Sequence, residues 1–191
     1  MPSLKGTQTE KHLLAAFAGE SQARSRYTFY ASQARKEGFR QIEALFLETA
    51  ENEKEHAKRF FKFLEGGMVE ITATFPAGVI GSTAENLAAA AAGEHEEWSE
   101  LYPEAAEVAK AEGFPMVAHV FRMVARVEKE HEARFRVLQK NVEEGKVFQK
   151  DAPVRWKCAN CGYIHEGTAP PATCPACDHP REYFEVAASN W

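Results

Sequence analysis

Two identical four-residue motifs combine carboxylates with a histidine. Glu53-Lys54-Glu55-His56 recurs letter for letter as Glu128-Lys129-Glu130-His131, 75 positions later. In each copy the first glutamate and the histidine are three residues apart, so on a helix their side chains lie on the same side. Mixed carboxylate and imidazole ligands suit iron or manganese. The repeated motif therefore predicts a metal site to which two parts of the chain contribute equally.

Further glutamates stand among apolar residues at helical spacing. Apolar positions run in steps of three and four through four stretches of the chain, and each stretch has a glutamate near its middle. One helical glutamate is ordinarily solvated. Burying five without matching Lys or Arg residues would be costly, so cations must come from outside. The candidate carboxylates are Glu20, Glu53, Glu94, Glu97 and Glu128.

The pattern matches a known class of metal site. Ferritin-like di-iron and di-manganese proteins use one Glu from each of two helices and Glu-x-x-His from each of two others, all pointing into a four-helix bundle. His56 and His131 are candidate ligands because they belong to the repeat. The remaining histidines lack such support and are interpreted as surface or satisfied core residues: His12, His95, His119, His165 and His179.

All four cysteines lie near the end of the chain, in two Cys-x-x-Cys pairs. Cys158 and Cys161 form the first pair, and Cys174 and Cys177 form the second. This spacing predicts four thiolates arranged tetrahedrally around one ion. It does not distinguish iron from the zinc of a structural ribbon. The segment 154–191 is not basic, which argues against a nucleic-acid ribbon, and a second metal centre beside a di-metal bundle favours electron transfer.

Four helices must position the glutamates. Capping-box spacings at Thr7/Glu10 and Ser82/Glu85 mark two helix starts, and glycines mark the stops. We predict helices at roughly 7–36, 39–65, 83–112 and 114–144. Two helix pairs with tight turns, joined by a longer connection from Gly66 to Ser82, match an all-α bundle with one long crossover.

The internal repeat also predicts an irregularity in the third helix. Its offset is 74 at Glu20/Glu94 but 75 at Tyr27/Tyr102, so the third helix has gained one residue between Glu94 and Tyr102. A helix can absorb an extra residue by widening one turn into an i→i+5 bulge, which keeps the downstream register. We therefore expect a bulge close to Glu97, with Leu101 remaining on the inward stripe.

Composition limits the remaining possibilities. The 191 residues are 45% hydrophobic and 27% charged, with a net charge of -5 and no run of Lys or Arg. Neither a nucleic acid nor a membrane is an expected partner, and without an apolar leader or spanning segment the expected location is the cytoplasm. We predict three parts: a bundle at 1–146, a linker at 147–153 and a small β/loop metal domain at 154–191.

Over essentially its whole length, the chain resembles rubrerythrin. Cys158-Ala-Asn-Cys161-Gly162-Tyr163 and Cys174-Pro175-Ala176-Cys177 resemble the two knuckles of a rubredoxin-like domain. Glu97, one turn after Glu94, is the extra carboxylate that separates rubrerythrins from plainer ferritin-like proteins. Residues available for the aromatic core of the small domain are Trp156, Tyr163 and Phe184.

The resemblance implies three iron ions per chain: an oxo- or hydroxo-bridged di-iron site and an Fe(Cys)4 site. Glu20 with Glu97 or His56 would hold one iron of the pair. Glu94 and His131 would hold the other, with Glu53 and Glu128 bridging. Tyr27 and Tyr102 would orient the terminal carboxylates, as groups behind metal ligands commonly do.

The resemblance also implies a catalytic activity. The chain would reduce hydrogen peroxide to two waters, with electrons passing through Fe(Cys)4 from an NAD(P)H-dependent reductase or a rubredoxin. A head-to-tail homodimer or a higher oligomer would bring the two centres together. We further expect Glu97 and His56 to exchange as ligands with redox state, because two ferrous ions balance four carboxylates whereas two ferric ions with a hydroxide match five.

Two other functions are compatible with the same residues. A ferroxidase or iron-sequestering protein would use the same di-iron bundle, and only the appended redox domain argues against it. Alternatively, the bundle is structural and the cysteine domain is a zinc-dependent interaction module. Visible colour distinguishes ferric thiolate, which is red, from colourless zinc thiolate.

Overall fold

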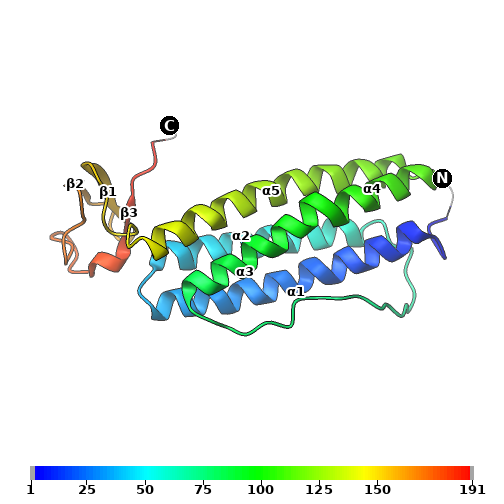
Figure 1. Ribbon diagram of the computed structural model, residues 1–191, viewed down its shortest axis with the longest axis horizontal. Coiled ribbons are helices and arrows are strands. Elements are labelled where there is room, and N and C mark those ends of the chain that lie inside the picture. Colours follow the sequence, from blue (N-terminus) through cyan, green and yellow to red (C-terminus); the bar gives the residue numbers. More distant parts are fainter. Residues whose placement is uncertain (1–2, 190–191) are drawn as a thin grey trace.

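A computed structural model describes residues 3–189, so the outermost residues of the two predicted domains lie outside the described part. The chain forms a long four-helix bundle with a small β domain at one end (Figure 1). The third long helix is divided into three segments. The helical bounds are α1 Gln8–Lys36, α2 Arg40–Phe61, α3 Thr83–Glu96, the π-helical turn η1 Glu97–Leu101, α4 Tyr102–Ala111 and α5 Pro115–Glu143.

The predicted helix starts at Thr7 and Ser82 are confirmed, with one difference in the capping at Thr7. Ser82 and Glu85 form a reciprocal capping box. The Thr7 side chain accepts from the Glu10 N–H, but the Glu10 carboxylate accepts from Gly6 N–H rather than from Thr7. Gly113, at φ +87°, follows α4 in the left-handed conformation that favours glycine.

The bulge in the third helix is confirmed at the expected place. Residues Glu97–Leu101 form a π-helical turn, and Tyr102 beyond it is buried. Leu101 was predicted to face inward, and this was wrong, because 48% of its surface is exposed. The wider turn brings Tyr102 to the inward position and leaves its neighbour facing outward.

A salt-bridged cluster fastens this turn to α5. Glu132, largely buried on α5, accepts hydrogen bonds from the indole N–H of Trp98 and from Arg136 Nε at 2.6 Å. His95 Nδ1 lies 3.1 Å from the same carboxylate. Trp98 belongs to the π-helical turn, so these contacts connect the residue after Glu97 with the helix that carries His131.

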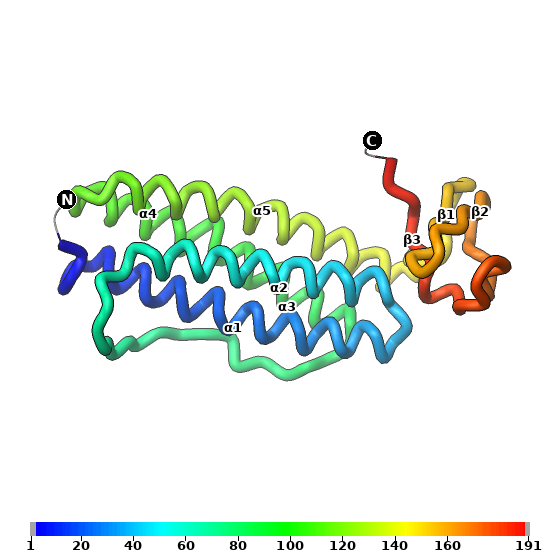
Figure 2. Tube along the Cα trace, turned by 180° about the vertical axis from the view of Figure 1, so that it is seen from behind, coloured from blue at the N-terminus to red at the C-terminus, as the bar shows by residue number. Residues whose placement is uncertain are grey.

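The long connection after α2 runs back along the bundle beside α1, as both views show (Figures 1 and 2). This confirms the single crossover, which α2 and α3 need because they run in the same direction. Helix α2 ends at Phe61, earlier than the predicted 65. The chain leaves the helix in short turns at Phe63 and Leu64, and Gly66 then adopts φ +77°.

Two apolar clusters fill the bundle interior, and together they contain buried apolar residues from all four long helices. One cluster includes Phe60, Tyr102 and Phe121, and the other includes Tyr27 and Phe135. The rings pack closely, with 4.9 Å between the centroids of Phe60 and Phe121 and 5.4 Å between those of Tyr27 and Phe135. Such packing holds the helices in fixed register.

The C-terminal domain is a small three-stranded antiparallel sheet in the order β2-β1-β3. Its elements are β1 Val154–Cys158, β2 Ile164–Gly167, the short helix η2 Arg181–Tyr183 and β3 Phe184–Val186. Trp156 and Phe184 are buried in its core together with Cys158 and Cys174. So small a core gains stability from a bound ion.

This domain lies against the end of the bundle where α1 turns into α2 (Figure 2). The Arg40 guanidinium is 4.8 Å from the centre of the Tyr183 ring, and an added Cβ at Gly38 would lie 3.1 Å from the Glu182 side chain. Phe39 stacks on Phe148 of the connecting segment at 6.3 Å. Among residues 3–189, no helix combines the length and the apolarity that crossing a membrane requires.

Candidate metal centres

Four carboxylates from four helices meet inside the bundle. Glu20 on α1, Glu53 on α2, Glu94 on α3 and Glu128 on α5 are each at most 1% exposed. Each comes from the apolar stripe of its helix, so the packing that forms the core also brings the acids together. Buried carboxylates without compensating charge are costly. The site therefore needs cations.

The donor atoms form two groups that share two members. Glu20, Glu53, His56 and Glu128 each offer one donor atom within 4.8 Å of the others, and so do Glu53, Glu94, Glu128 and His131. The shared residues are Glu53 and Glu128, which come from the two copies of the repeated motif. Two neighbouring sites with two common carboxylates are what a pair of ions requires.

The two oxygens of Glu53, like those of Glu128, lie close to different histidines. His56 Nδ1 lies 2.9 Å from Glu53 Oε2 and 2.9 Å from Glu128 Oε1. His131 Nδ1 lies 3.2 Å from Glu53 Oε1 and 2.9 Å from Glu128 Oε2. Each carboxylate thus directs one oxygen toward each histidine. Donors about 2.1 Å from a first-row metal ion at right angles lie about 3.0 Å apart, so the spacing fits.

Hydrogen bonding does not account for this arrangement. An imidazole Nδ1 donates at most one hydrogen, yet each is surrounded by several carboxylate oxygens. Within residues 3–189, many of these buried atoms have no hydrogen-bond partner despite their proximity. They are Glu20 Oε2, Glu53 Oε1, Glu94 Oε2, both oxygens of Glu128 and His131 Nδ1. Excess acceptors directed at common points fit metal ions.

Without ions, protons replace part of the missing charge. Burial, reinforced by neighbouring carboxylates, raises the pKa of Glu20 well above its usual value, and burial raises that of Glu94 to about 8. Burial lowers the pKa values of His56 and His131, but the carboxylates of Glu128 and Glu53 outweigh burial. The pKa of His56 is raised to about 10 and that of His131 to about 12. Metal binding must therefore release protons.

Glu53 shows the opposite balance. Burial raises its pKa, but the neighbouring imidazoles of His131 and His56 outweigh burial and lower it to about 2. This carboxylate thus stays ionised between the two histidines, which suits a bridging ligand.

Two tyrosines support the outer carboxylates. Tyr27 on α1 donates from its hydroxyl to Glu94 Oε1 at 2.6 Å, and Tyr102 on α4 donates to Glu20 Oε1. Burial and the neighbouring carboxylates raise both tyrosine pKa values well above the usual value, so each hydroxyl remains a donor. Each hydrogen bond joins the two halves of the repeat, because each tyrosine donates to a carboxylate of the other half.

Glu97 lies apart from both groups of donors. It is half-buried in the π-helical turn and lines a cavity of about 470 Å³ between α1, the crossover and the third helix. Burial and the charges of Glu94 and Glu128 raise its pKa, and Arg26 opposes the rise. His56, not Glu97, completes the group around Glu20 in this structure.

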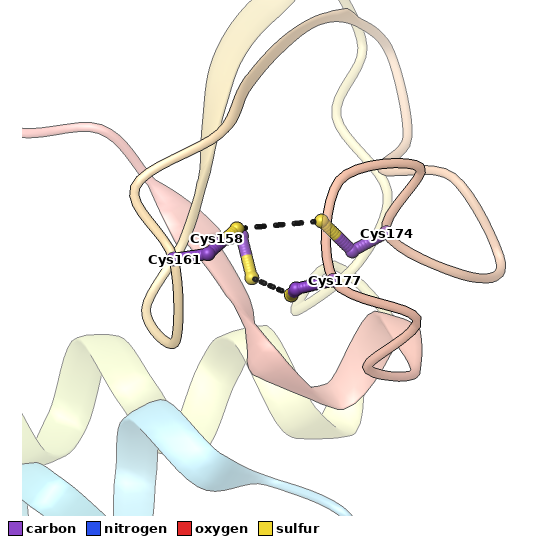
Figure 3. Close-up of side chains that lie close together, drawn as sticks. All are labelled: Cys158, Cys161, Cys174 and Cys177. Atoms are coloured by element: carbon purple, nitrogen blue, oxygen red, sulfur yellow. Dashed lines mark hydrogen bonds between the residues drawn. The ribbon is translucent and has the colours of Figure 1, made fainter.

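The four cysteines converge as their spacing predicts (Figure 3). Cys158 Sγ lies 3.8 Å from Cys177 Sγ, and Cys161 Sγ lies 3.6 Å from Cys174 Sγ. A disulfide requires about 2.05 Å, whereas thiolates about 2.3 Å from a tetrahedral ion lie about 3.8 Å apart. The observed spacing fits four thiolates on one ion.

Backbone groups favour the thiolate form at the second knuckle. The backbone N–H of His179 lowers the pKa of Cys177 to about 6. Each knuckle is closed by a turn, in which Gly162 N–H donates to Cys158 O at 2.8 Å and Asp178 N–H to Cys174 O at 2.9 Å. Cys158 and Cys174 are buried, while Cys161 is exposed.

Sequence reasoning missed one charged residue beside the pair of sites. Arg26 on α1 lines the same cavity as Glu97. Its counterpart in the repeat, 75 positions later, is Leu101, so the repeat gave no signal for it. His12, interpreted as an ordinary histidine, also lines this cavity.

Comparisons with known proteins agree with this architecture. A profile of the family named rubrerythrin matches residues 11–139, and one named rubrerythrin, rubredoxin-like domain, matches residues 156–185. A rubrerythrin of Porphyromonas gingivalis is 63% identical, with 99% of this chain and 94% of that protein covered. A rubrerythrin of Nitratidesulfovibrio vulgaris is 54% identical over the full length of both chains.

Solved structures give the same result. A nigerythrin structure described as partially reduced superposes with a TM-score of 0.63 at 30% identity, covering 96% of this chain and 91% of that one. Symerythrin from Cyanophora paradoxa, reduced with dithionite, superposes with a TM-score of 0.62 at 20% identity, covering 75% of this chain and 89% of that one. The second likeness concerns the fold alone.

Proposed function

Because the chain belongs to the rubrerythrin family of oxidoreductases, with a di-iron site and a rubredoxin-like four-cysteine site, we propose that it is a peroxidase. It reduces hydrogen peroxide to water with electrons that enter through the Fe(Cys)4 site. The observation that carries this proposal is the presence, in one chain, of two donor groups sharing Glu53 and Glu128 and of a separate four-thiolate site.

The proposed ligands follow the two donor groups. Glu20 and His56 would hold one iron and Glu94 and His131 the other, with Glu53 and Glu128 available to both. Glu97 would take the place of His56 in the oxidised protein, where the higher charge of the ions would match a fifth carboxylate. The four thiolates of Cys158, Cys161, Cys174 and Cys177 hold the third iron.

When bound, the iron pair supplies the two electrons that O–O cleavage needs. The protein contributes access, orientation and charge. The cavity beside Glu97 has room for peroxide and is lined by Tyr102, whose hydroxyl donates to the buried Glu20. The hydroxyls of Tyr27 and Tyr102 fix Glu94 and Glu20, because a ligand held by a hydrogen bond keeps its orientation. The apolar clusters on the bundle helices limit the entry of water.

The distance between the two centres favours cooperation between subunits. His131 precedes the end of α5 at Glu143 by about 12 residues, or about 18 Å at the rise of an α-helix, and the cysteine domain follows beyond that end (Figure 1). We propose a head-to-tail homodimer, or a higher oligomer, in which one chain's cysteine site serves the partner's irons. The electron donor is a rubredoxin or an NAD(P)H-dependent reductase, and the cytoplasm, a reducing compartment, suits the free thiols.

Mixing two inactive variants tests this arrangement. Cys174→Ser removes the thiolate site and Glu128→Ala removes a shared ligand. Hybrids formed by unfolding and refolding the two together should recover peroxide turnover, since each hybrid retains one intact site of each kind on opposite chains. Hybrid dimers without activity would contradict transfer between subunits.

A steady-state assay tests the function itself. We expect hydrogen peroxide to drive NADH consumption when a donor reductase is present, with little Fe(II) oxidation into mineral. Fast Fe(II) oxidation with mineral formation and no peroxide-driven NADH consumption would favour the ferroxidase function. A colourless protein that binds zinc at its cysteines would favour the interaction module.

A further inference from the structure

The guanidinium of Arg26 lies 5.7 Å from the centre of the Tyr27 ring, whose hydroxyl donates to Glu94 of one donor group. Arg26 lines the cavity, and within residues 3–189 its Nε and Nη1 atoms are buried without a hydrogen-bond partner. A guanidinium is always charged, and leaving buried charged donors unpaired is costly. Arg24, slightly earlier on the same helix, shows the ordinary case, with a surface ion pair to Glu51 at 3.0 Å. Nε and Nη1 of Arg26 therefore lack an acceptor.

A glycine on the third helix makes room for this guanidinium. An ideal Cβ at Gly93 would lie 3.7 Å from Arg26 Nη2, so the side chain reaches the bare backbone of α3. Gly93 and Glu97 are four residues apart on that helix, and such positions are neighbours with about 5–6 Å between Cβ atoms. The guanidinium thus lies one helical turn from Glu97.

Charge balance makes Glu97 the missing acceptor. The five carboxylates exceed by one the charge of two divalent ions, and Glu97 is the one outside both donor groups. Arg26 is the one Lys or Arg among the described residues that line the cavity. The other ionisable lining residues are His12, Glu96, Glu97, Tyr102 and Glu104. Pairing Glu97 with Arg26 would neutralise both the extra anion and the unpaired cation.

We propose that Arg26 is a positioning residue that receives the Glu97 carboxylate whenever His56 is a metal ligand. The inference rests on the exchange between Glu97 and His56 that the proposed function includes. Arg26 holds Glu97 at the cavity wall while both ions are divalent, and Glu97 leaves it for the metal when the ions are trivalent. Without the guanidinium, Glu97 stays on a divalent ion and excludes His56.

Cobalt(II) provides a readout that does not depend on activity. An imidazole that binds Co(II) through Nδ1 keeps a hydrogen on Nε2. The NMR signal of this hydrogen is strongly shifted by the nearby Co(II), and it disappears in D2O because the hydrogen exchanges with deuterium. The wild-type dicobalt protein should show two such signals, from His56 and His131, and Arg26→Gln should show one. Arg26→Lys, which keeps the charge, should restore the second, and the control Arg24→Gln should show two.

The other possible results of the cobalt experiment also test the role of Arg26. Two signals in Arg26→Gln, or one in the wild type, would overturn the proposal. If Arg26→Gln does not bind two cobalt ions, hydrogen exchange of the Arg26 side chain is measured instead in the zinc-loaded wild type and in zinc-loaded Glu97→Ala. The Arg26 Nε–H should exchange slowly with solvent in the wild type and fast in Glu97→Ala. Slow exchange that persists in Glu97→Ala would overturn the proposal.

The inference about Arg26 and the proposed function can fail separately. If the cobalt signals are as predicted but the iron-loaded protein does not reduce peroxide, the Arg26 inference stands and the proposed function is refuted.

Discussion

Removing the hydroxyl of Tyr27 should weaken metal binding without disturbing the core. Tyr27 donates to Glu94 Oε1 at 2.6 Å and is 1% exposed, so Tyr27→Phe deletes one hydrogen bond and little volume. Without metal, Glu94 has a pKa of about 8 and is largely protonated at neutral pH. With metal it is ionised, and hydrogen bonds to ionised acceptors are stronger. The change therefore destabilises the metal-bound form more than the free form.

The expected magnitude follows from that difference. A hydrogen bond to a charged group contributes about 1.5–3 kcal/mol, and losing a partner behind a ligand lowers metal affinity about 10- to 100-fold. Titration of the metal-free protein with Co(II) against a competing chelator measures the change at the site to which Glu94 belongs.

A neighbouring tyrosine supplies the control. Tyr30 is 3% exposed and packs on the Phe46 ring, as Tyr27 does, but its hydroxyl has no carboxylate partner among the described residues. Tyr30→Phe should change the affinity by less than about twofold. Equal affinities for Tyr27→Phe and Tyr30→Phe would refute the orienting role of Tyr27.

Three further results are expected. Because the carboxylates raise the pKa values of His56 and His131 to about 10 and 12 in the metal-free protein, loading both sites at pH 7 should release about two protons or more, and the apparent affinity should fall as the pH is lowered. Proton release measured in weak buffer checks this, and uptake without release would contradict it. Glu97→Ala should keep both irons, since it leaves both donor groups complete, but should slow peroxide turnover, and unchanged turnover would rule out the ligand exchange. Cys174→Ser should abolish the red colour and the NADH-driven turnover while the bundle keeps its two irons by metal analysis, and a variant that still turns over would show that electrons enter by another route.

The features predicted from sequence are those that the repeat and the helical period encode. The buried carboxylates lie on apolar stripes, so their convergence follows from helix packing alone. The π-helical turn follows from the change in repeat offset between Glu94 and Tyr102, because a helix that gains one residue must rotate or widen. The cysteine knuckles follow from their spacing.

The missed features depend on contacts between elements that no local pattern encodes. Arg26 has an ordinary helical position, and only the bare backbone at Gly93 on another helix gives its guanidinium a place. Leu101 faces outward because the widened turn assigns the inward position to Tyr102. The contact of Arg40 with Tyr183, which helps to fix the cysteine domain on the bundle, likewise joins distant parts of the chain.

Rapid mixing of the fully reduced protein with hydrogen peroxide tests the central claim most directly. The reduced Fe(Cys)4 site is bleached, and its ferric colour reports the moment at which it gives up an electron. With no external donor present, we predict that peroxide is consumed and that the red colour returns within the time of a single turnover. Peroxide that disappears while the site stays bleached would contradict an electron path from the cysteine domain to the buried iron pair.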